Sequence, residues 1–351
     1  MILATLLNSY PRIGDRPAEQ VLRRALHGAD REEVRPAAVA EAEDEMTRMA
    51  LREQSDAGMD LLSDGQIRWH DPVSHMARGL AGFRIEGLLR YFDTNTYYRQ
   101  PAAVAPIGRE RPFLVDAYRF AAAAAAPGRV KGIVTGPITL ARLSRDERGR
   151  GLRVLALEIA SALNREILDL EAAGAPLIQV DEPALARFPE TAALSLLAMR
   201  RLVAGLSSAR VILATSFGDA LPILGDLAAL PAAVLGIDAV TALQRLTDPG
   251  IVPESVAGAA GEIGARLAAD LPPGSGLLLG VIDGRNTRLE DPDETYERRV
   301  RPLLEPLRSA PGRRDVHLAP NHGLEFLPRD TARAKLSVLA ALRDRARQEF
   351  A

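Results

Sequence analysis

The sequence predicts an α/β fold in which eight parallel strands and eight helices close into one (β/α)8 TIM barrel over residues 1–351. Eight short apolar runs recur along the chain, and helix-like segments lie between them. The alternation of strands with helices is typical of a parallel sheet that is covered by helices. Eight such units in a chain of 351 residues favour a closed barrel over an open sheet.

The eight runs are nearly continuous in apolar residues, which is the pattern of strands buried on both faces. They cover residues 2–7, 59–63, 130–135, 177–181, 211–216, 234–238, 277–282 and 316–319. Helices are expected over residues 18–27, 34–57, 152–173, 192–206, 220–229, 253–271, 293–308 and 329–349. In the segment 152–173, leucine, isoleucine and alanine recur at helical spacing, and Gly174 ends the helix.

One connection breaks this regularity. Residues 65–128, after the second predicted strand, are far longer than a usual connection from a strand to a helix. They contain the only tryptophan, Trp69, and an aromatic cluster formed by Tyr91, Phe92, Tyr97 and Tyr98. We expect a long loop or insertion at the barrel mouth that acts as a lid or a substrate platform.

Composition excludes several classes of function. The chain has 44 basic and 46 acidic residues and a net charge of -2, which argues against nucleic acid or a membrane surface as a partner. No apolar run reaches the roughly 18 residues of a membrane helix, and the N-terminus lacks the pattern of a signal peptide, so we expect a cytoplasmic protein. The chain has no cysteine, which excludes disulfides, thiolate metal ligands and thiol nucleophiles.

Polar residues follow each predicted strand, at the end of the barrel where this fold places its chemistry. Three acids are expected to point into one mouth: Asp181, Asp238 and Asp283. Three further polar residues are expected to join them: Ser9, Gln66 and Asn286. Such a set would hold a small zwitterion, with carboxylates facing its ammonium group and Ser9 or backbone N–H groups facing its carboxylate.

Structural roles compete with these assignments. An aspartate after a barrel strand also caps the next helix, which applies to Asp238 and Asp283. Gly136 and Pro137 are interpreted as turn residues. His70 and His75 are five positions apart rather than the helical four and make a poor metal pair. His322 follows the last strand at the mouth, where a functional and a structural role are equally open.

Five strings along the chain together resemble cobalamin-independent methionine synthase, the zinc-dependent homocysteine methyltransferase. They are Ser9-Tyr10-Pro11-Arg12, Thr135-Gly136-Pro137-Ile138-Thr139-Leu140, Gln179-Val180-Asp181-Glu182-Pro183-Ala184-Leu185, Gly280-Val281-Ile282-Asp283-Gly284-Arg285-Asn286-Thr287 and Gly323-Leu324-Glu325-Phe326-Leu327-Pro328. They occur in the family's order and span nearly the whole chain. The resemblance is to the single-barrel form of the family, and it implies a (β/α)8 fold and methyl transfer to a thiol.

The resemblance also implies roles for particular residues. The family's homocysteine-binding serine matches Ser9, and the aspartate of its Asp-Glu-Pro motif matches Asp181. Its second substrate carboxylate, a glutamate after strand two, falls on Gln66, and this change removes a charge that would face the substrate ammonium group.

The zinc site departs further from the family. The family's His-x-Cys pair aligns with Ala214-Thr215-Ser216, so only Asp238 and His322 remain as metal ligands. Zinc in proteins usually takes three or four protein ligands. A thiol with a pKa of about 8.5 is only slightly ionised at neutral pH, so without zinc another group must ionise it. Arg12, Arg68 or Arg285 would then stabilise the thiolate, and His322 would accept the proton.

The sequence leaves three functions open. The first is a methionine-synthase-like S-methyltransferase of methionine biosynthesis that acts on homocysteine or a similar small thiol. Its methyl donor would be a methylfolate or a methyl-corrinoid protein, the latter as a partner. The second is another thiol alkyltransferase or lyase on the same scaffold, with a rebuilt His/Asp metal site. The third is a non-catalytic paralogue that binds an amino acid or serves as a partner subunit. Metal content separates the first two from the third, and substrate screening separates the first from the second.

Overall fold

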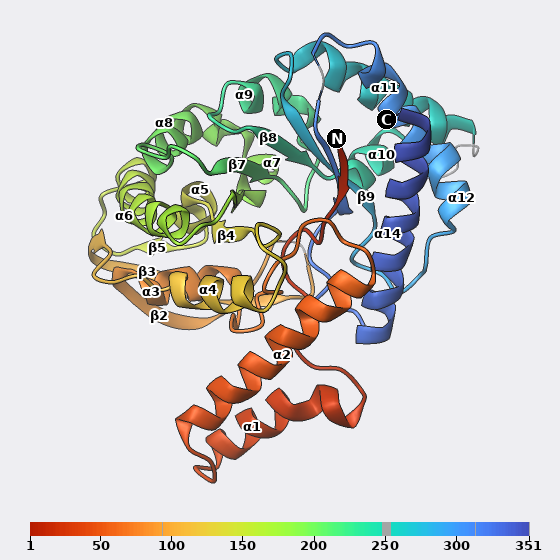
Figure 1. Cartoon of the computed structure of the whole chain (residues 1–351). Coiled ribbons are helices and arrows are strands. Elements are labelled where there is room, and N and C mark those ends of the chain that lie inside the picture. Colours follow the sequence, from red (N-terminus) through yellow and green to blue (C-terminus); the bar gives the residue numbers. More distant parts are fainter. Residues whose placement is uncertain (93, 248–253, 313, 351) are drawn as a thin grey trace.

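A seven-stranded parallel sheet curls around the centre of the molecule in the order β1-β10-β9-β8-β7-β6-β4 (Figure 1). The computed structural model describes residues 1–92, 94–247, 254–312 and 314–350. The strands are β1 (Ile2–Ala4), β4 (Gly132–Thr135), β6 (Leu177–Asp181), β7 (Arg210–Ala214), β8 (Val234–Ile237), β9 (Gly276–Ile282) and β10 (Val316–Pro320). They are buried almost throughout, as continuous apolar runs predicted.

Residues 61–62 close the sheet into a barrel. Thr5 pairs with Leu61 and Leu62 pairs with Val130, both in parallel, so this short segment lies between β1 and β4. The strand expected over residues 59–63 is therefore reduced to two bridges. The side chain of Arg129 takes the place of some backbone hydrogen bonds of this strand, because its guanidinium group donates to the carbonyls of Met59 and Asp60. The prediction of a (β/α)8 barrel is confirmed.

Helices cover the outside of the sheet (Figure 1). They are α5 (Pro137–Arg142), α6 (Leu152–Ala172), α7 (Pro183–Arg187), α8 (Ala192–Leu202), α9 (Leu224–Ala228), α10 (Ala239–Leu246), α11 (Glu254–Asp270), α12 (Pro292–Thr295), α13 (Arg301–Arg308) and α14 (Arg329–Phe350). A π-helical turn, Tyr296–Val300, joins α12 to α13. Short 3₁₀ turns cover Pro17–Gln20, Pro189–Thr191 and Leu221–Ile223. The start of the helix expected over residues 253–271 lies outside the described residues.

The segment 65–128 is folded rather than a plain loop. It contains α3 (Pro72–Gly79), an antiparallel hairpin of β2 (Ala81–Arg90) and β3 (Tyr97–Gly108), and α4 (Val115–Ala123). A two-residue strand, β5 (Arg145–Asp146), extends the hairpin to a three-stranded sheet beside the barrel. The expected long connection is therefore present, but with a sheet of its own.

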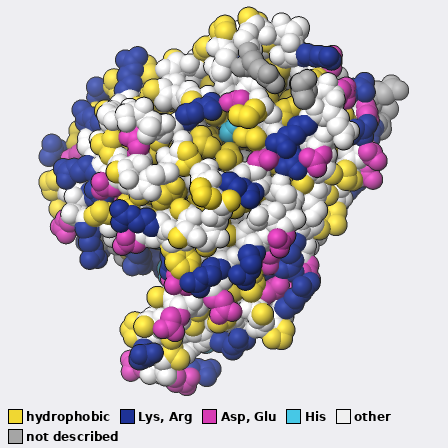
Figure 2. Space-filling view, viewed as in Figure 1, with side chains coloured by type: hydrophobic (Ala, Val, Ile, Leu, Met, Phe, Trp, Pro, Cys, Tyr) yellow, Lys and Arg dark blue, Asp and Glu magenta, His cyan; other side chains and the backbone are white. Residues whose placement is uncertain are grey.

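Two helices near the N-terminus, α1 (Val21–Asp30) and α2 (Pro36–Asp56), pack on one another and project from the barrel (Figure 1). Figure 2 shows basic and acidic side chains interspersed over the visible face, including this pair of helices. That distribution agrees with the net charge of -2. Within the described parts of the chain, every helix is too short or too polar to cross a membrane.

Candidate functional site

A cavity of about 310 Å³ opens at the carboxyl ends of the strands, where this fold places its active sites. Segments that are distant in the sequence meet there: the loops after β1, β6, β7 and β10, the segment after residues 61–62, and the hairpin. Its lining includes polar and aromatic side chains: Asn8, Ser9, Arg12, Gln66, Trp69, Tyr91, Tyr98, Asp181, Phe217 and Glu325. One part of this wall is polar and the other is aromatic.

A chain of hydrogen bonds runs from the barrel interior to the cavity. The buried Lys131 directly precedes β4. It donates to the carbonyls of Leu6 and Leu7 at 2.7 and 2.8 Å and to Gln179 Oε1 at 2.6 Å. Gln179 Nε2 donates to Asp181 Oδ1 at 2.6 Å. Asn8 Nδ2 donates to Asp181 Oδ2 at 3.3 Å. Both oxygens of Asp181 are thus held in fixed positions.

Glu325 is the second carboxylate of the cavity. The hydroxyl of Ser9 donates to Glu325 Oε2 at 2.5 Å. A Cβ atom at Gly323 would displace the ends of three polar side chains, Ser9 Oγ, Glu325 Oε2 and Asn8 Oδ1, so these groups fill the space beside the glycine. The polar wall therefore concentrates hydrogen-bond acceptors in a small space.

Burial sets the protonation of this wall. It raises the pKa of Asp181 to about 6, although the bonds from Gln179 and Asn8 and the charge of Lys131 act in the opposite direction. Burial also raises the pKa of Glu325, and the negative charge of Asp181 adds to that shift. Two carboxylates with raised pKa values in one cavity indicate a functional site, because such shifts cluster where a ligand or a proton is handled.

Two further polar residues of the cavity wall, Gln66 and Arg12, carry hydrogen-bond donors. Gln66 is 5% exposed and has a left-handed φ of 52°, which is uncommon for a residue other than glycine. Its Nε2 and the Nη2 of Arg12 are both buried without a hydrogen-bond partner among the described residues. The guanidinium group of Arg12 is oriented by a 2.6 Å bond from Nε to the carbonyl of Ile67.

Phe217 forms the centre of the aromatic part. Its φ of 58° is a strained value for a bulky residue, and strain of this kind persists where the surroundings enforce it. The ring packs edge-to-face against Tyr91, with centroids 5.5 Å apart, and stacks on His322 at 4.9 Å. Phe217 therefore covers His322 on the cavity side.

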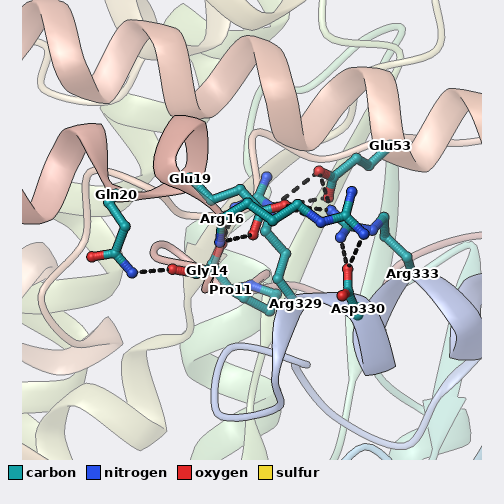
Figure 3. Close-up of polar contacts among 9 residues, drawn as sticks. All are labelled: Pro11, Gly14, Arg16, Glu19, Gln20, Glu53, Arg329, Asp330 and Arg333. Atoms are coloured by element: carbon teal, nitrogen blue, oxygen red, sulfur yellow. Dashed lines mark hydrogen bonds and ion pairs between the residues drawn. The ribbon is translucent and has the colours of Figure 1, made fainter.

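A polar cluster fixes the loop that carries Ser9 and Arg12 (Figure 3). Arg329, at the start of α14 and 1% exposed, donates to the carbonyl of Pro11 at 2.5 Å and pairs with Glu53 of α2 at 3.0 Å. Arg333, one turn later, pairs with Glu53 and with Glu19 of the loop at 2.8 and 2.9 Å. Helices α2 and α14 thus hold the first loop of the cavity in place.

The Asp-Glu-Pro and Thr-Gly-Pro motifs meet for a structural reason. Glu182 is fully buried, and its carboxylate accepts from the N–H groups of Ile138 and Thr139 at 2.9 and 2.7 Å, which caps the start of α5. A Cβ atom on Gly136 would collide with this carboxylate. Gly136 is therefore needed for close packing against Glu182, and its interpretation as a turn residue stays a prediction.

The structure separates the expected polar set. Ser9, Arg12, Gln66 and Asp181 line the cavity together, whereas Asp238 does not. The side chain of Asp238 caps α10, accepting from the N–H and hydroxyl groups of Thr241 at 2.8 and 2.7 Å. The convergence of all three acids in one mouth is therefore corrected.

Asp283 and Asn286 line a different depression beside α12. Asn286 Nδ2 donates to Asp283 Oδ2 at 2.6 Å, and Asp283 Oδ1 accepts from the N–H of Arg285, so the three form a local turn. His322 is 3% exposed, and burial lowers its pKa to about 4, which makes it a weak proton acceptor at neutral pH. The roles expected for these residues stay predictions.

Two cavity residues were not among the expected site residues. Glu325 lies five positions beyond β10, inside a string quoted for the family resemblance, and its distance from the strand end obscured it. Asn8 directly follows the first apolar run, and an asparagine at a strand end gives no signal of its own in the sequence. A search for carboxylates within a few residues of each strand end would have found Glu325.

Comparisons with known proteins show the family of the chain. Residues 2–196 match the family described as cobalamin-independent synthase, catalytic domain. A methionine synthase of Sulfurisphaera tokodaii is 31% identical over 215 residues, which cover 61% of this chain and 61% of that protein. One from Saccharolobus islandicus is 28% identical over 339 residues, which cover 96% of this chain and 92% of that protein. The chain belongs to the cobalamin-independent synthase family, as its motifs predicted.

A solved structure shares the fold over the full length. The B12-independent methionine synthase from Shewanella sp. W3-18-1 in complex with selenomethionine superimposes with a TM-score of 0.76 at 19% identity, covering 99% of this chain and 98% of that one. The matches to the first two curated relatives span 61% and 64% of their lengths, less than two thirds.

The residues present do not fit the zinc ion that the family resemblance implies. Both carboxylate oxygens of Asp238 are engaged by Thr241, and the Nε2 of His322 is buried behind Phe217. Within the described ranges, no group of three or more His, Cys, Asp or Glu residues is placed to hold a metal ion. Zinc in proteins needs three or four such ligands. We derive no chemical step through a metal.

Proposed function

We propose that the protein is an S-methyltransferase that moves a methyl group to the thiol of homocysteine or a closely similar amino acid. The observation that carries the proposal is the placement of two carboxylates, the buried Asp181 and the half-buried Glu325, which are joined through Asn8 and Ser9 in one cavity of about 310 Å³. Family membership supports methyl transfer as the reaction.

Asp181 is assigned to the ammonium group of the substrate. Its oxygens are held from two sides by Gln179 and Asn8, and a fixed carboxylate is a strong partner for a cation in a buried site. Glu325 is assigned to the proton of the thiol. It is half-buried and therefore keeps contact with solvent, to which it can release the proton.

The reaction balances without a further reactant. The bond between sulfur and the methyl carbon forms while the bond between the methyl carbon and the donor breaks, and the donor keeps that electron pair. The proton of the thiol passes to the carboxylate of Glu325, and the donor nitrogen, which keeps the electron pair, takes up one proton in turn, so that thiol and methyl donor become thioether and protonated donor. The raised pKa of Glu325 makes it a better acceptor than an ordinary carboxylate for a thiol of pKa about 8.5.

The aromatic wall supports a methylfolate rather than a methyl-corrinoid protein as the donor. Trp69, Tyr91 and Phe217 line the same cavity as the carboxylates, and aromatic side chains favour stacking with a flat heterocycle. A heterocycle in that part would bring its methyl group beside the amino-acid part of the cavity.

The test measures methionine formed from homocysteine and 5-methyltetrahydrofolate by the full chain and its variants. We expect Asp181→Asn to raise the KM for homocysteine at least tenfold, and Glu325→Gln to lower kcat at least tenfold with a smaller effect on KM. Glu41→Gln, an exposed position on α2, is the control and should behave as the parent. Unchanged kinetics in both site variants would refute the proposal.

A second function, binding of an amino acid without methyl transfer, is favoured by one observation: the zinc ligands of the family do not fit here. The same assay separates the two. A chain that binds methionine but forms none from homocysteine with either a methylfolate or a methyl-corrinoid donor is a binding protein.

A further inference from the structure

We propose that Arg12 and Gln66 form an anion-binding pair that holds the carboxylate of the amino-acid ligand. The inference rests on the proposed function, because it adds the second end of the same ligand. It also fixes the ligand's direction in the cavity, with the ammonium group at Asp181 and the carboxylate at the loops after β1 and after residues 61–62.

Two buried donors without partners carry the inference. Gln66 is only 5% exposed, and its Nε2 has no hydrogen-bond acceptor among the described residues. The Nη2 of Arg12 is likewise buried and without an acceptor among them. Both side chains line the cavity. A buried polar group without a partner costs free energy, so two of them in one cavity indicate an acceptor that arrives with the ligand.

The two side chains are held ready for such a ligand. The Nε of Arg12 donates to the carbonyl of Ile67, directly after Gln66 in the chain, so the guanidinium group is tied to the segment that carries the amide. The backbone N–H of Gln66 donates to Asp64 Oδ1 at 2.9 Å, which stabilises the turn with its left-handed φ. Preorganised donors of this kind bind a carboxylate with little loss of side-chain entropy.

Charge decides which ligand group goes to which side. Asp181 and Glu325 would repel a carboxylate, and Arg12 would repel an ammonium group. Glutamine at position 66 fits this division, because its amide donates where a glutamate would add a third negative charge. A zwitterion with both groups on one carbon satisfies both sides at once, whereas a simple thiol satisfies neither.

The experiment separates the two ends of the ligand by using three probes: L-methionine, L-methioninamide, which lacks the carboxylate, and 4-(methylthio)butanoate, which lacks the ammonium group. Calorimetric titration gives the affinity of each probe for the full chain. The parent should bind methionine at least tenfold more tightly than either analogue.

Gln66→Glu and Arg12→Gln should each weaken methionine binding at least tenfold and remove the preference over methioninamide. Both variants should keep a preference for methionine over 4-(methylthio)butanoate. Arg23→Gln, an exposed position on α1, is the matched control and should bind all three probes as the parent does. If Arg12→Gln does not fold, Gln66→Glu and Gln66→Leu test the same point.

The inference and the proposed function fail in different ways. If the parent forms methionine but binds methioninamide as tightly as methionine, the inference is wrong and the proposed function stands. The inference is also wrong if folded Gln66→Glu keeps the full preference for the carboxylate. If the parent binds none of the three probes, both are overturned.

Discussion

Lys131 shows how a single buried side chain orients the cavity. Lys131 is 2% exposed, and its ammonium group donates three hydrogen bonds, to two backbone carbonyls and to the side chain of Gln179. Burial lowers its pKa to about 7, and the charge of Asp181 opposes that shift. Because Gln179 accepts from Lys131, its amide must present its N–H groups to Leu7 and Asp181. The lysine therefore determines the direction of the amide that holds Asp181.

The raised pKa of Asp181 predicts a pH dependence of ligand binding. An ammonium group binds the ionised carboxylate, so protonation of Asp181 competes with the ligand. Affinity for methionine should therefore be full well above pH 6, fall to about half at pH 6 and decline further below it, by up to tenfold per pH unit. Titration calorimetry between pH 4.5 and 8 measures this decline.

Two comparisons make that profile specific. Asp181→Asn should bind weakly and lose the decline that Asp181 causes near pH 6, while Glu325 and Lys131, whose pKa values are also shifted, still titrate. His322 does not account for a change near pH 6, since burial lowers its pKa to about 4. A profile in Asp181→Asn identical to that of the parent would count against the assignment.

At the scale of elements, Glu182 joins β6 to α5. Its carboxylate accepts from two N–H groups at the start of α5 and from the hydroxyl of Thr139 at 2.6 Å. The fold thus uses the second residue of the Asp-Glu-Pro motif to anchor a helix and the first, Asp181, to face the cavity.

Loss of this anchor should destabilise the barrel. In Glu182→Gln the amide N–H groups would face the donors of Thr139, so buried donors would lose their acceptor. We expect a loss of about 2–4 kcal/mol in the free energy of unfolding, measured by urea denaturation. Glu190→Gln is the control, since Glu190 is 64% exposed and 3.7 Å from Arg142, and it should change stability by less than about 0.5 kcal/mol. Equal effects of the two substitutions would show that Glu182 is not an anchor.

The elements were predictable to different degrees. The apolar runs that became β4, β6, β7, β8, β9 and β10 were found because a parallel strand buried on both faces has no polar alternation to hide it. The hairpin of β2 and β3 was missed. Its residues alternate only loosely in exposure and include two register shifts, so the segment resembled a loop.

At the scale of the whole molecule, barrel closure creates the site. The cavity wall draws on the first loop of the chain, on the hairpin and on residues near the C-terminus, and no local pattern joins them. Strand ends indicated correctly that Ser9, Asp181 and Gln66 share one end of the barrel. They did not indicate which acids hydrogen-bond to their own chain segment instead of facing the cavity. Asp238 is one of these, because its carboxylate caps α10.

The buried donors of Arg12 and Gln66 also depended on the folded structure. The sequence placed both residues at the mouth, but a missing hydrogen-bond partner is a property of packing. The same holds for Phe217, whose ring separates His322 from the cavity. Tertiary contacts, not the residue types, decide these points.

The most direct test of the central claim is a titration of L-methionine into the full chain after exhaustive removal of metal ions, beside the same titration into Asp181→Asn. If the proposed function is right, the cavity holds the amino acid through its own side chains, so the metal-free parent should bind methionine as tightly as the protein before metal removal, and the variant at least tenfold more weakly. Binding that is lost on metal removal and restored by zinc would contradict the claim.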